Sequence, residues 1–482
     1  MSNDLLFELS KAGRKGYTLP SLDVPEADLG TLLPESVVRD TGPGLPEVSE
    51  VDVVRHFVRL SALNHHVDKG FYPLGSCTMK YNPKVNEVVA AFPGFSRLHP
   101  MTPPDLTQGA MRLMFELGEY LKEIAGLDAV TLQPAAGAQG ELTGLLIASA
   151  YHAKNGSPRK KVITTDSAHG TNPASIRLAG YEVVTVSSDT EGLVDIEKLG
   201  AALGDEVAVF MLTNPNTLGK FEKNILKITS MVHDCGALMY MDGANLNALL
   251  HIVKPGEMGF DILHFNLHKT FSTPHGGGGP GAGPVGVKEH LAGFLPVPTV
   301  IREGDGKYSF DYNIPGTIGK IHSYYGNFAV MVKAYTYIRM LGASGLRQVA
   351  LDAILSANYI MKKLEPFYYN PFPGPCMHEC VLSGVNQKER GVRTLDIAKR
   401  LLDFGVHAPT VYFPLIVQEA LMIEPTETES LESLDVFIDA MKAIDSESLD
   451  APEKLKAAPY TTPVRRLDEV QAARKPILKW GS

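Results

Sequence analysis

The sequence has little cysteine, a single tryptophan and no long hydrophobic run. Its 482 residues include four cysteines, too few for a disulfide-stabilised scaffold and typical of a reducing cytoplasm. No apolar stretch approaches the ~20 residues that a membrane helix needs. The N-terminal residues lack the basic segment and apolar core of a secretory signal. We therefore expect a cytoplasmic protein that does not enter a membrane.

An excess of basic residues is also absent. The formal net charge is −9, which argues against nucleic-acid binding because such proteins usually carry a basic face. A hydrophobic content of 44% is ordinary and predicts a folded, globular chain. Its length indicates about three domain-sized units. We predict an N-terminal arm with an active-site loop over residues 1–80, a large domain over 81–340, and a small C-terminal α/β domain with a tail over 341–482.

The most informative stretch runs from residue 260 to residue 270 and has a lysine near its end. Apolar and polar residues alternate from Ile262 to His268, which predicts a strand with one polar face. The strand would place Lys269 at its C-terminal edge, ahead of the glycines at 276–279. A partly desolvated lysine is suited there to forming a Schiff base with a carbonyl cofactor. The alternative for a single lysine is a surface position before a flexible loop.

A second strand-like stretch, residues 237–245, contains Asp242 near its end. The spacing between Asp242 and Lys269 accommodates one crossover and one return strand of a parallel sheet. Both side chains would then lie at the same sheet edge, where α/β proteins bind ligands. Pyridoxal phosphate needs such a pair, because a lysine carries its aldehyde and a carboxylate keeps its pyridine nitrogen protonated.

Other residues at this edge complete the predicted cofactor site. Gly137, Ala138 and Gln139 form a small-residue turn that opens a helix, whose free N–H groups can bind a phosphate. The same pattern is typical of an ordinary strand-to-helix turn. A lone histidine is more often a hydrogen-bonded structural residue, so stacking by His169 on a ring depends on the whole set. The further candidates are Asn214, which follows another strand, and the neighbours of the lysine, His268 and Thr270.

Three other kinds of site are disfavoured by their context. Glycines 281, 283 and 286 match G-x-G-x-x-G, but a strand-like segment follows where a dinucleotide site requires a helix. No P-loop pattern occurs. The histidines and cysteine of residues 65–77 fit no standard metal spacing, and those of residues 376–380 are better explained by a packed strand. We predict no metal site.

Four segments together resemble one enzyme family. They are Phe71–Pro83, Gln133–Glu141, Ala168–Ser175 and Asn266–Phe271. These segments, and nearly the whole chain, are similar to glycine dehydrogenase (decarboxylating) subunit 2, the lysine-bearing C-terminal half of the glycine cleavage P-protein. The resemblance implies an α/β fold of the type I pyridoxal-phosphate (aspartate aminotransferase-like) class, with a large, mostly parallel sheet.

The resemblance also implies an activity, a cofactor and partners. The activity would be decarboxylation of glycine with transfer of the aminomethyl group to the lipoyl arm of H-protein. The cofactor would be pyridoxal 5'-phosphate, attached to Lys269, with Asp242 facing its pyridine nitrogen and His169 stacked on its ring. These three would be the catalytic residues. The partners would be P-protein subunit 1, in a heterotetramer of two of each, and lipoylated H-protein.

Some questions remain open at the level of sequence. Lys320 or a group of the other subunit would have to bind the glycine carboxylate. Ala138 stands where many type I enzymes have serine or threonine, so Gln139, Thr270 or a partner residue would have to replace that hydrogen bond. Two other functions stay possible: another type I amino-acid decarboxylase or aminotransferase, and a non-catalytic assembly subunit.

Overall fold

The computed structural model describes residues 4–276, 279 and 281–479. The chain divides into two compact units, Met1–His66 and Val67–Ser482. Residues 67–80, which we grouped with the N-terminal arm, thus lie in the second unit. A division of that second unit near residue 340 stays a prediction.

The first unit is built from short helices and extended chain. Its elements are α1 Leu6–Leu9, α2 Leu29–Leu32, the 3-10 turn η1 Glu35–Val37, and α3 Glu50–Leu63. Helix α3 begins after Ser49, because the Ser49 hydroxyl accepts from the Asp52 N–H and the Asp52 carboxylate accepts from the Ser49 N–H. These described helices bury only His56. The unit therefore has almost no hydrophobic core.

The second unit contains a seven-stranded sheet with the order β1-β7-β6-β5-β4-β2-β3. Strands β2 to β6 pair in parallel, whereas β7 runs antiparallel to β1 and β6. The predicted large, mostly parallel sheet is confirmed. The strands are β1 Ala129–Thr131, β2 Lys161–Thr165, β3 Glu182–Val186, β4 Val207–Thr213, β5 Leu238–Gly243, β6 Ile262–Phe265 and β7 Val285–Val287.

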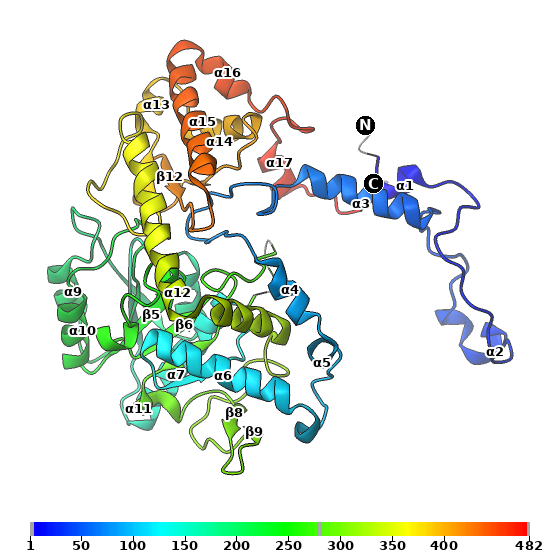
Figure 1. Ribbon diagram of the computed structural model, residues 1–482, viewed down its shortest axis with the longest axis horizontal. Helices are drawn as coiled ribbons and strands as arrows, with labels where there is room; N and C mark the ends of the chain where they lie inside the picture. Colours follow the sequence, from blue (N-terminus) through cyan, green and yellow to red (C-terminus); the bar gives the residue numbers. More distant parts are fainter. Residues whose placement is uncertain (1–3, 277–278, 280, 480–482) are drawn as a thin grey trace. The chain divides into compact units, whose positions relative to one another are not determined.

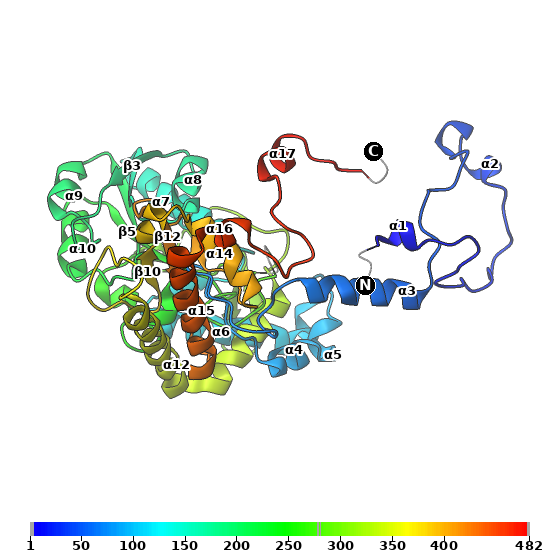
Figure 2. The same ribbon diagram turned by 90° about the horizontal axis from the view of Figure 1, so that it is seen from above.

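Side chains of the central strands alternate between two hydrophobic clusters, one on each face of the sheet. In β4, Phe210 and Leu212 belong to one cluster, and Val209 and Met211 to the other. This period of two is expected for a strand buried on both faces. Helices cover both faces (Figures 1 and 2), with α6, α9, α10 and the start of α12 contributing to the first cluster and α7, α8 and α11 to the second.

These covering helices are α6 Gln108–Ala125, α7 Gly137–Lys154, α8 Thr171–Leu178, α9 Ile196–Ala202, α10 Ile225–Asp234, α11 Glu289–Ala292 and α12 Phe328–Leu364. The shorter elements are α4 Lys84–Ala90, α5 Pro93–Ser96, η2 Pro104–Leu106, η3 Leu246–Ala248, η4 Pro255–Met258, and the antiparallel pair β8 Thr299–Arg302 and β9 Tyr308–Asp311. No described helix is both long and apolar enough to cross a membrane.

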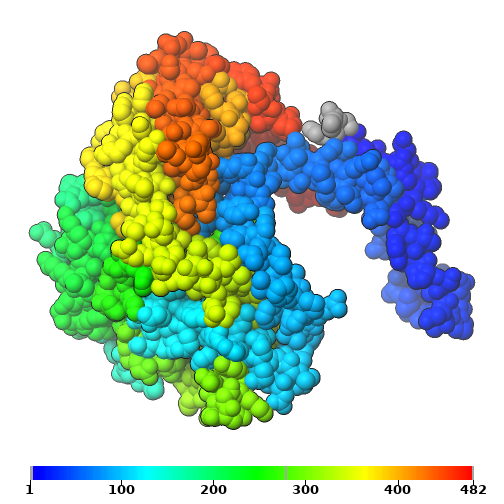
Figure 3. Space-filling model, viewed as in Figure 1, coloured from blue at the N-terminus to red at the C-terminus, as the bar shows by residue number. Residues whose placement is uncertain are grey.

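A second, antiparallel sheet has the order β10-β12-β11. Helix α12 connects the part of the unit that contains the seven-stranded sheet with the part that contains the three-stranded one. It contacts α4 and α6 near its start and α15 further on. Figure 1 shows its change of direction, which occurs at Gly342, with a φ of 60°. Figure 3 shows α12 against α15 on the surface. The remaining elements are β10 Cys380–Ser383, β11 Thr410–Val411, β12 Ala420–Ile423, α13 Val385–Glu389, α14 Thr394–Asp403, α15 Leu431–Asp450, α16 Pro452–Ala457 and α17 Glu469–Arg474.

The strand that we predicted over residues 376–380 is wrong for most of its length. Only Cys380 lies in β10. The preceding residues are held by the loop that follows β4, since the Met377 N–H donates to the Gly219 carbonyl at 2.7 Å. They are nevertheless packed inside the protein: Cys376 and His378 are both buried.

The two-sided burial of the central strands predicts how a core truncation affects stability. Leu263 in β6 is fully buried, so Leu263→Ala should lower the free energy of unfolding by about 2–5 kcal/mol. Leu226→Ala in α10 is the matched control, because Leu226 is 67% exposed and its truncation should change stability by no more than about 0.5 kcal/mol. Urea unfolding of both variants measures the difference. Equal losses would contradict the described core.

Candidate active site

Polar side chains occupy the carboxyl ends of three adjacent parallel strands. The register pairs Asp242 of β5 with Thr213 of β4 on one side and with His264 of β6 on the other. Lys269 follows β6 in a turn. The sequence predicted that two neighbouring parallel strands present Asp242 and Lys269 at one edge, and the parallel pairing of β5 with β6 confirms the strands. The alternation had predicted a strand as far as His268, whereas β6 ends at Phe265. The two residues therefore lie at one edge of the sheet.

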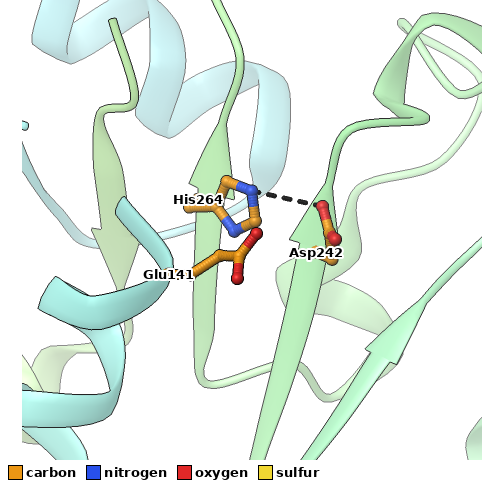
Figure 4. Close-up of side chains that lie close together, drawn as sticks. All are labelled: Glu141, Asp242 and His264. Atoms are coloured by element: carbon orange, nitrogen blue, oxygen red, sulfur yellow. Dashed lines mark ion pairs between the residues drawn. The ribbon is translucent and has the colours of Figure 1, made fainter. Parts of the chain in front are cut away.

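Asp242 is buried and fully hydrogen-bonded. Its carboxylate accepts from Asn172 Nδ2 at 3.0 Å and from the Ala244 N–H at 2.9 Å. His264 Nε2 lies 3.2 Å from the same carboxylate (Figure 4). Burial by itself raises the pKa of Asp242, but interactions with His264, Lys269 and Asn172 outweigh it and lower the pKa below its ordinary value. Asp242 therefore keeps its negative charge at neutral pH.

A second layer of polar residues orients this group. The other ring nitrogen of His264, Nδ1, lies 3.0 Å from the Tyr240 hydroxyl, which also lies 3.2 Å from the Gly140 carbonyl. Figure 4 shows Glu141 of α7 beside His264. One Glu141 oxygen accepts from the Thr171 hydroxyl at 2.7 Å. His264, Tyr240 and Glu141 were not predicted as site residues, although the alternation around His264 had indicated a polar residue within a strand.

Lys269 is held by a segment from far earlier in the chain. Its Nζ donates to the Ser76 carbonyl at 2.9 Å. The next residue, Cys77, places its Sγ 3.6 Å from His275 Nε2. The sequence had marked residues 71–83 as part of a family resemblance but had given none of them a role at the lysine. Of the glycines at 276–279, residues 277 and 278 lie outside the described residues.

Several histidines surround the lysine in uncharged form. Burial and the charge of Lys269 lower the pKa of His268 to about 3 and lower that of His275 as well. The same two causes, in the same order, lower the pKa of His169. His169 Nδ1 lies 2.9 Å from the Thr171 hydroxyl, and its ring meets the ring of Phe413 edge-on at 5.8 Å between centroids. Stacking of His169 on a cofactor stays a prediction.

The predicted phosphate turn opens α7. The first N–H groups of the helix, from Gly137 to Gln139, have no intrahelical acceptor and are available to an anion. Gly137 is required here, since a Cβ on it would lie 2.3 Å from Asn266 Oδ1. The Gln139 side chain is already engaged, because its Oε1 accepts from the Ala135 N–H and its Nε2 donates to the Ile321 carbonyl. It therefore cannot replace the hydroxyl that Ala138 lacks without breaking one of these bonds.

Buried polar atoms near this edge lack partners within the described part of the chain. They are Thr213 Oγ1, Asn214 Nδ2, Asn266 Nδ2 and Thr270 Oγ1. Buried donors in native proteins are normally satisfied, so a polar ligand fits this set. Two of the four, Asn214 and Thr270, were predicted from the sequence to bind a cofactor, whereas Thr213 and Asn266 were missed.

The lowered pKa of His268 predicts a pH dependence of stability. Between pH 6.5 and about 3 the unfolded chain binds a proton at this residue that the folded chain does not, so stability falls as the pH falls, by up to ~1.4 kcal/mol per pH unit. His268→Gln should flatten this fall while keeping an acceptor for the Ala282 N–H. Urea unfolding at several pH values from 4 to 6.5 measures the slope.

The matched control is His233→Gln. The hydrogen bond to Asp261 raises the pKa of His233, so this histidine contributes stability that is fully present below pH 6.5 and is lost only at higher pH. The His233→Gln variant should therefore be less stable at acidic pH but keep the wild-type slope there. An unchanged slope in His268→Gln would show that His268 is not a buried, uncharged residue.

Comparisons with known proteins agree with this arrangement. Residues 349–462 match the family model described as glycine dehydrogenase, C-terminal domain, and residues 141–296 match aminotransferase class-V. The fold also resembles the crystal structure of a glycine decarboxylase (P-protein) of the glycine cleavage system in inhibitor-bound form, with a TM-score of 0.72 and 23% identity over 87% of this chain and 95% of that one. The predicted type I pyridoxal-phosphate fold class is confirmed.

Full-length relatives are much more similar. The chain is 59% identical to the probable glycine dehydrogenase (decarboxylating) subunit 2 of Caldanaerobacter subterraneus subsp. tengcongensis, over 99% of each chain. It is 60% identical to the protein of that name in Chlorobaculum tepidum, over 98% of this chain and 99% of the relative. The resemblance that the four sequence segments indicated is confirmed. This chain belongs to the glycine dehydrogenase (decarboxylating) subunit 2 family.

Proposed function

We propose that Lys269, Asp242 and His169 perform the pyridoxal-phosphate chemistry by which this family decarboxylates glycine. The observation that carries the proposal is the placement of Asp242 and Lys269 at the ends of paired parallel strands. In this proposal the aminomethyl product passes to the lipoyl arm of H-protein. Pyridoxal phosphate, when bound, supplies a ring that accepts the electron pair left by departing CO2.

The residues at the sheet edge fit this cofactor. The α7 N-terminus, from Gly137 to Gln139, offers N–H groups and a partial positive charge to a phosphate. Thr270 and Asn214 each have a buried polar atom without a partner among the described residues. Asp242 offers a buried anion to a protonated ring nitrogen. The cofactor would thus be held by an anion site at one end and by a carboxylate at the other.

The roles of the residues follow from their contacts. Lys269 would attach the cofactor through its amine, and Ser76 gives that amine a fixed acceptor when it carries protons. His264 and Asn172 keep Asp242 charged, so Asp242 can keep a proton on a facing nitrogen. Thr171 would fix the ring of His169 through the contact at Nδ1. His268 would lie beside the attached lysine as an uncharged neighbour.

The glycine carboxylate still needs a cation. Lys320 was the sequence candidate, and its Nζ lies 5.7 Å from the centre of the Tyr312 ring. A group of a partner subunit is the other candidate. Reconstitution with the partner separates the two possibilities, because Lys320→Ala should raise the KM for glycine only if Lys320 binds it.

The family name, subunit 2, implies a partner subunit. We propose that the partner is P-protein subunit 1, in a heterotetramer of two of each, and that lipoylated H-protein is the acceptor. We also propose a cytoplasmic location, which the four free cysteines support. The alternative activity is another pyridoxal-phosphate reaction of an amino acid without H-protein, as in an aminotransferase, and the match of residues 141–296 to aminotransferase class-V is consistent with it.

Exchange of labelled bicarbonate into the glycine carboxyl group tests the proposed function. The exchange is measured with this chain alone, with the partner subunit, and with lipoylated H-protein added. We expect exchange in the complete mixture and a loss of at least about 10³-fold in Lys269→Ala, because no other group can replace the covalent attachment. Lys288→Ala is the matched control, since Lys288 pairs with Asp128 away from the site and its loss should leave the exchange unchanged.

A second readout does not depend on activity. Borohydride reduction followed by peptide mass spectrometry should place the pyridoxyl group on Lys269 and on no other lysine. Trapping on a different lysine would refute the assignment of Lys269. Trapping on Lys269 with no exchange in any mixture, but with amine release from another amino acid, would favour the alternative activity.

A further inference from the structure

Two buried glutamates bind the segment that contacts the lysine. Glu379 Oε2 accepts from the Ser76 N–H at 2.8 Å, and Glu424 Oε2 accepts from the Thr78 N–H at 3.0 Å. Both glutamates are fully buried. The carbonyl of Ser76 accepts from Lys269 at 2.9 Å. One peptide segment therefore connects the two carboxyl groups to the amine.

The backbone of this segment has a conformation that side-chain-bearing residues rarely adopt. Ser76 has a φ of 63° and Thr78 a φ of 37°, both in the left-handed region. This region is unfavourable for most residues and most of all for a β-branched one such as threonine. Such a conformation persists only where the surroundings impose it. The hydrogen bonds that the Ser76 and Thr78 N–H groups donate to Glu379 and Glu424 supply that constraint at the two strained residues.

The two carboxyl groups have no basic partner in the described chain. Among the described residues, neither forms an ion pair with a lysine or arginine. Asn245 Nδ2 is the other donor to Glu379, at 3.2 Å. His378 Nε2 lies 3.9 Å from an oxygen of each, but burial and Lys269 lower the pKa of this histidine to about 3, so it is uncharged. The two carboxyl groups lie within 4.8 Å of each other, and such a buried pair with no cation in contact cannot have both groups ionised without a large free-energy cost.

At least one carboxyl group of the pair therefore holds a proton near neutral pH. Burial and the neighbouring carboxylate raise the pKa of Glu379 well above its usual range, and burial raises that of Glu424 to about 7, against the hydrogen bonds of Thr78. The other charged groups that act on the pair are Lys269 and, for Glu424, Glu427. Glu427 is itself bonded to the buried Lys80 at 2.8 Å.

We propose that Glu379 and Glu424 are positioning residues that hold the Ser76–Thr78 backbone against the amine of Lys269. The role goes beyond the functions assigned above to the cofactor site, and it rests on Lys269 being the reactive lysine. Neither glutamate needs to touch the cofactor, because each acts through the peptide that it binds. Their contribution is to keep the Ser76 carbonyl where it accepts from Nζ.

A comparison of Glu424→Ala with Glu424→Gln tests the role. Neither alanine nor glutamine carries a charge at position 424, so the charge near Lys269 is the same in both variants. They differ in the acceptor for the Thr78 N–H, which glutamine keeps and alanine removes. The readout is the rate at which trace acetic anhydride labels Lys269 at pH 8 in the full chain prepared without pyridoxal phosphate, measured by mass spectrometry relative to Lys288.

Glu424→Ala should label Lys269 about fivefold faster or more, because a displaced Ser76 carbonyl no longer accepts the hydrogen bond that occupies Nζ. Glu424→Gln should stay within about twofold of the wild type.

Asp445→Ala is the control for losing a buried carboxylate elsewhere. Asp445 binds Gln387 and Arg390 in the C-terminal part of the chain, and its loss should lower stability without changing the labelling of Lys269. If Glu424→Ala does not fold, Glu424→Asp, which shortens the reach by one carbon, should label at least about twofold faster.

Three results would overturn the proposal. Wild-type labelling in a folded Glu424→Ala or Glu424→Asp variant would show that the carboxyl group does not position the segment. An equal change in Glu424→Gln would assign the effect to charge. One equivalent of a divalent metal in the purified protein would make Glu379, Glu424 and His378 metal ligands instead. The proposed function fails separately, if borohydride does not trap the cofactor on Lys269.

Discussion

The site depends above all on the parallel pairing of β5 with β6. That pairing sets Asp242 opposite His264 and brings the turn containing Lys269 to the same edge. A shift of one residue in β6 would turn its side chains to the opposite faces. His264 would then leave Asp242, and Leu263 would leave the hydrophobic cluster beneath the sheet. The core packing of the strand and the polar contacts of the site therefore enforce the same register.

The cost of burying a charge explains why so many polar groups gather around Asp242. An ionised carboxylate away from water is stable only with hydrogen bonds and an electrostatic partner. Asp242 obtains them from His264, Asn172 and the Ala244 N–H. His264 in turn requires Tyr240, whose ring packs on the second hydrophobic cluster. Groups on or next to β5, β6 and α8 thus stabilise the charge of Asp242 and hold its carboxylate in place relative to the sheet.

Local patterns were enough to predict the sheet edge but not the segment that reaches it from residue 76. Alternation and spacing placed Asp242 and Lys269 on neighbouring strands, since a parallel sheet leaves few other connections. Family resemblance added the role of His169. Glu379 and Glu424 could not be found this way, because they bind Ser76 and Thr78 across 303 and 346 positions of sequence. Each lies beside the end of a strand, before Cys380 of β10 or after Ile423 of β12, and a glutamate beside a strand is usually a solvated side chain. The hydrogen bonds of the Gln139 side chain could not be predicted either, because its partners are backbone groups that come close only when the chain folds.

The lysine and its acceptor come from different layers of the protein. Lys269 belongs to the large sheet, whereas the segment containing Ser76 is anchored on the small one: Leu74 forms an antiparallel bridge with Ile423 of β12, and the Glu424 N–H donates to the Pro73 carbonyl at 3.3 Å. The distance from Nζ to the Ser76 carbonyl is therefore set by how the two sheets pack. Helix α12 contacts both layers and changes direction at Gly342 between them. A change in the packing of the small sheet would therefore move the Ser76 carbonyl and alter its hydrogen bond with Lys269 Nζ.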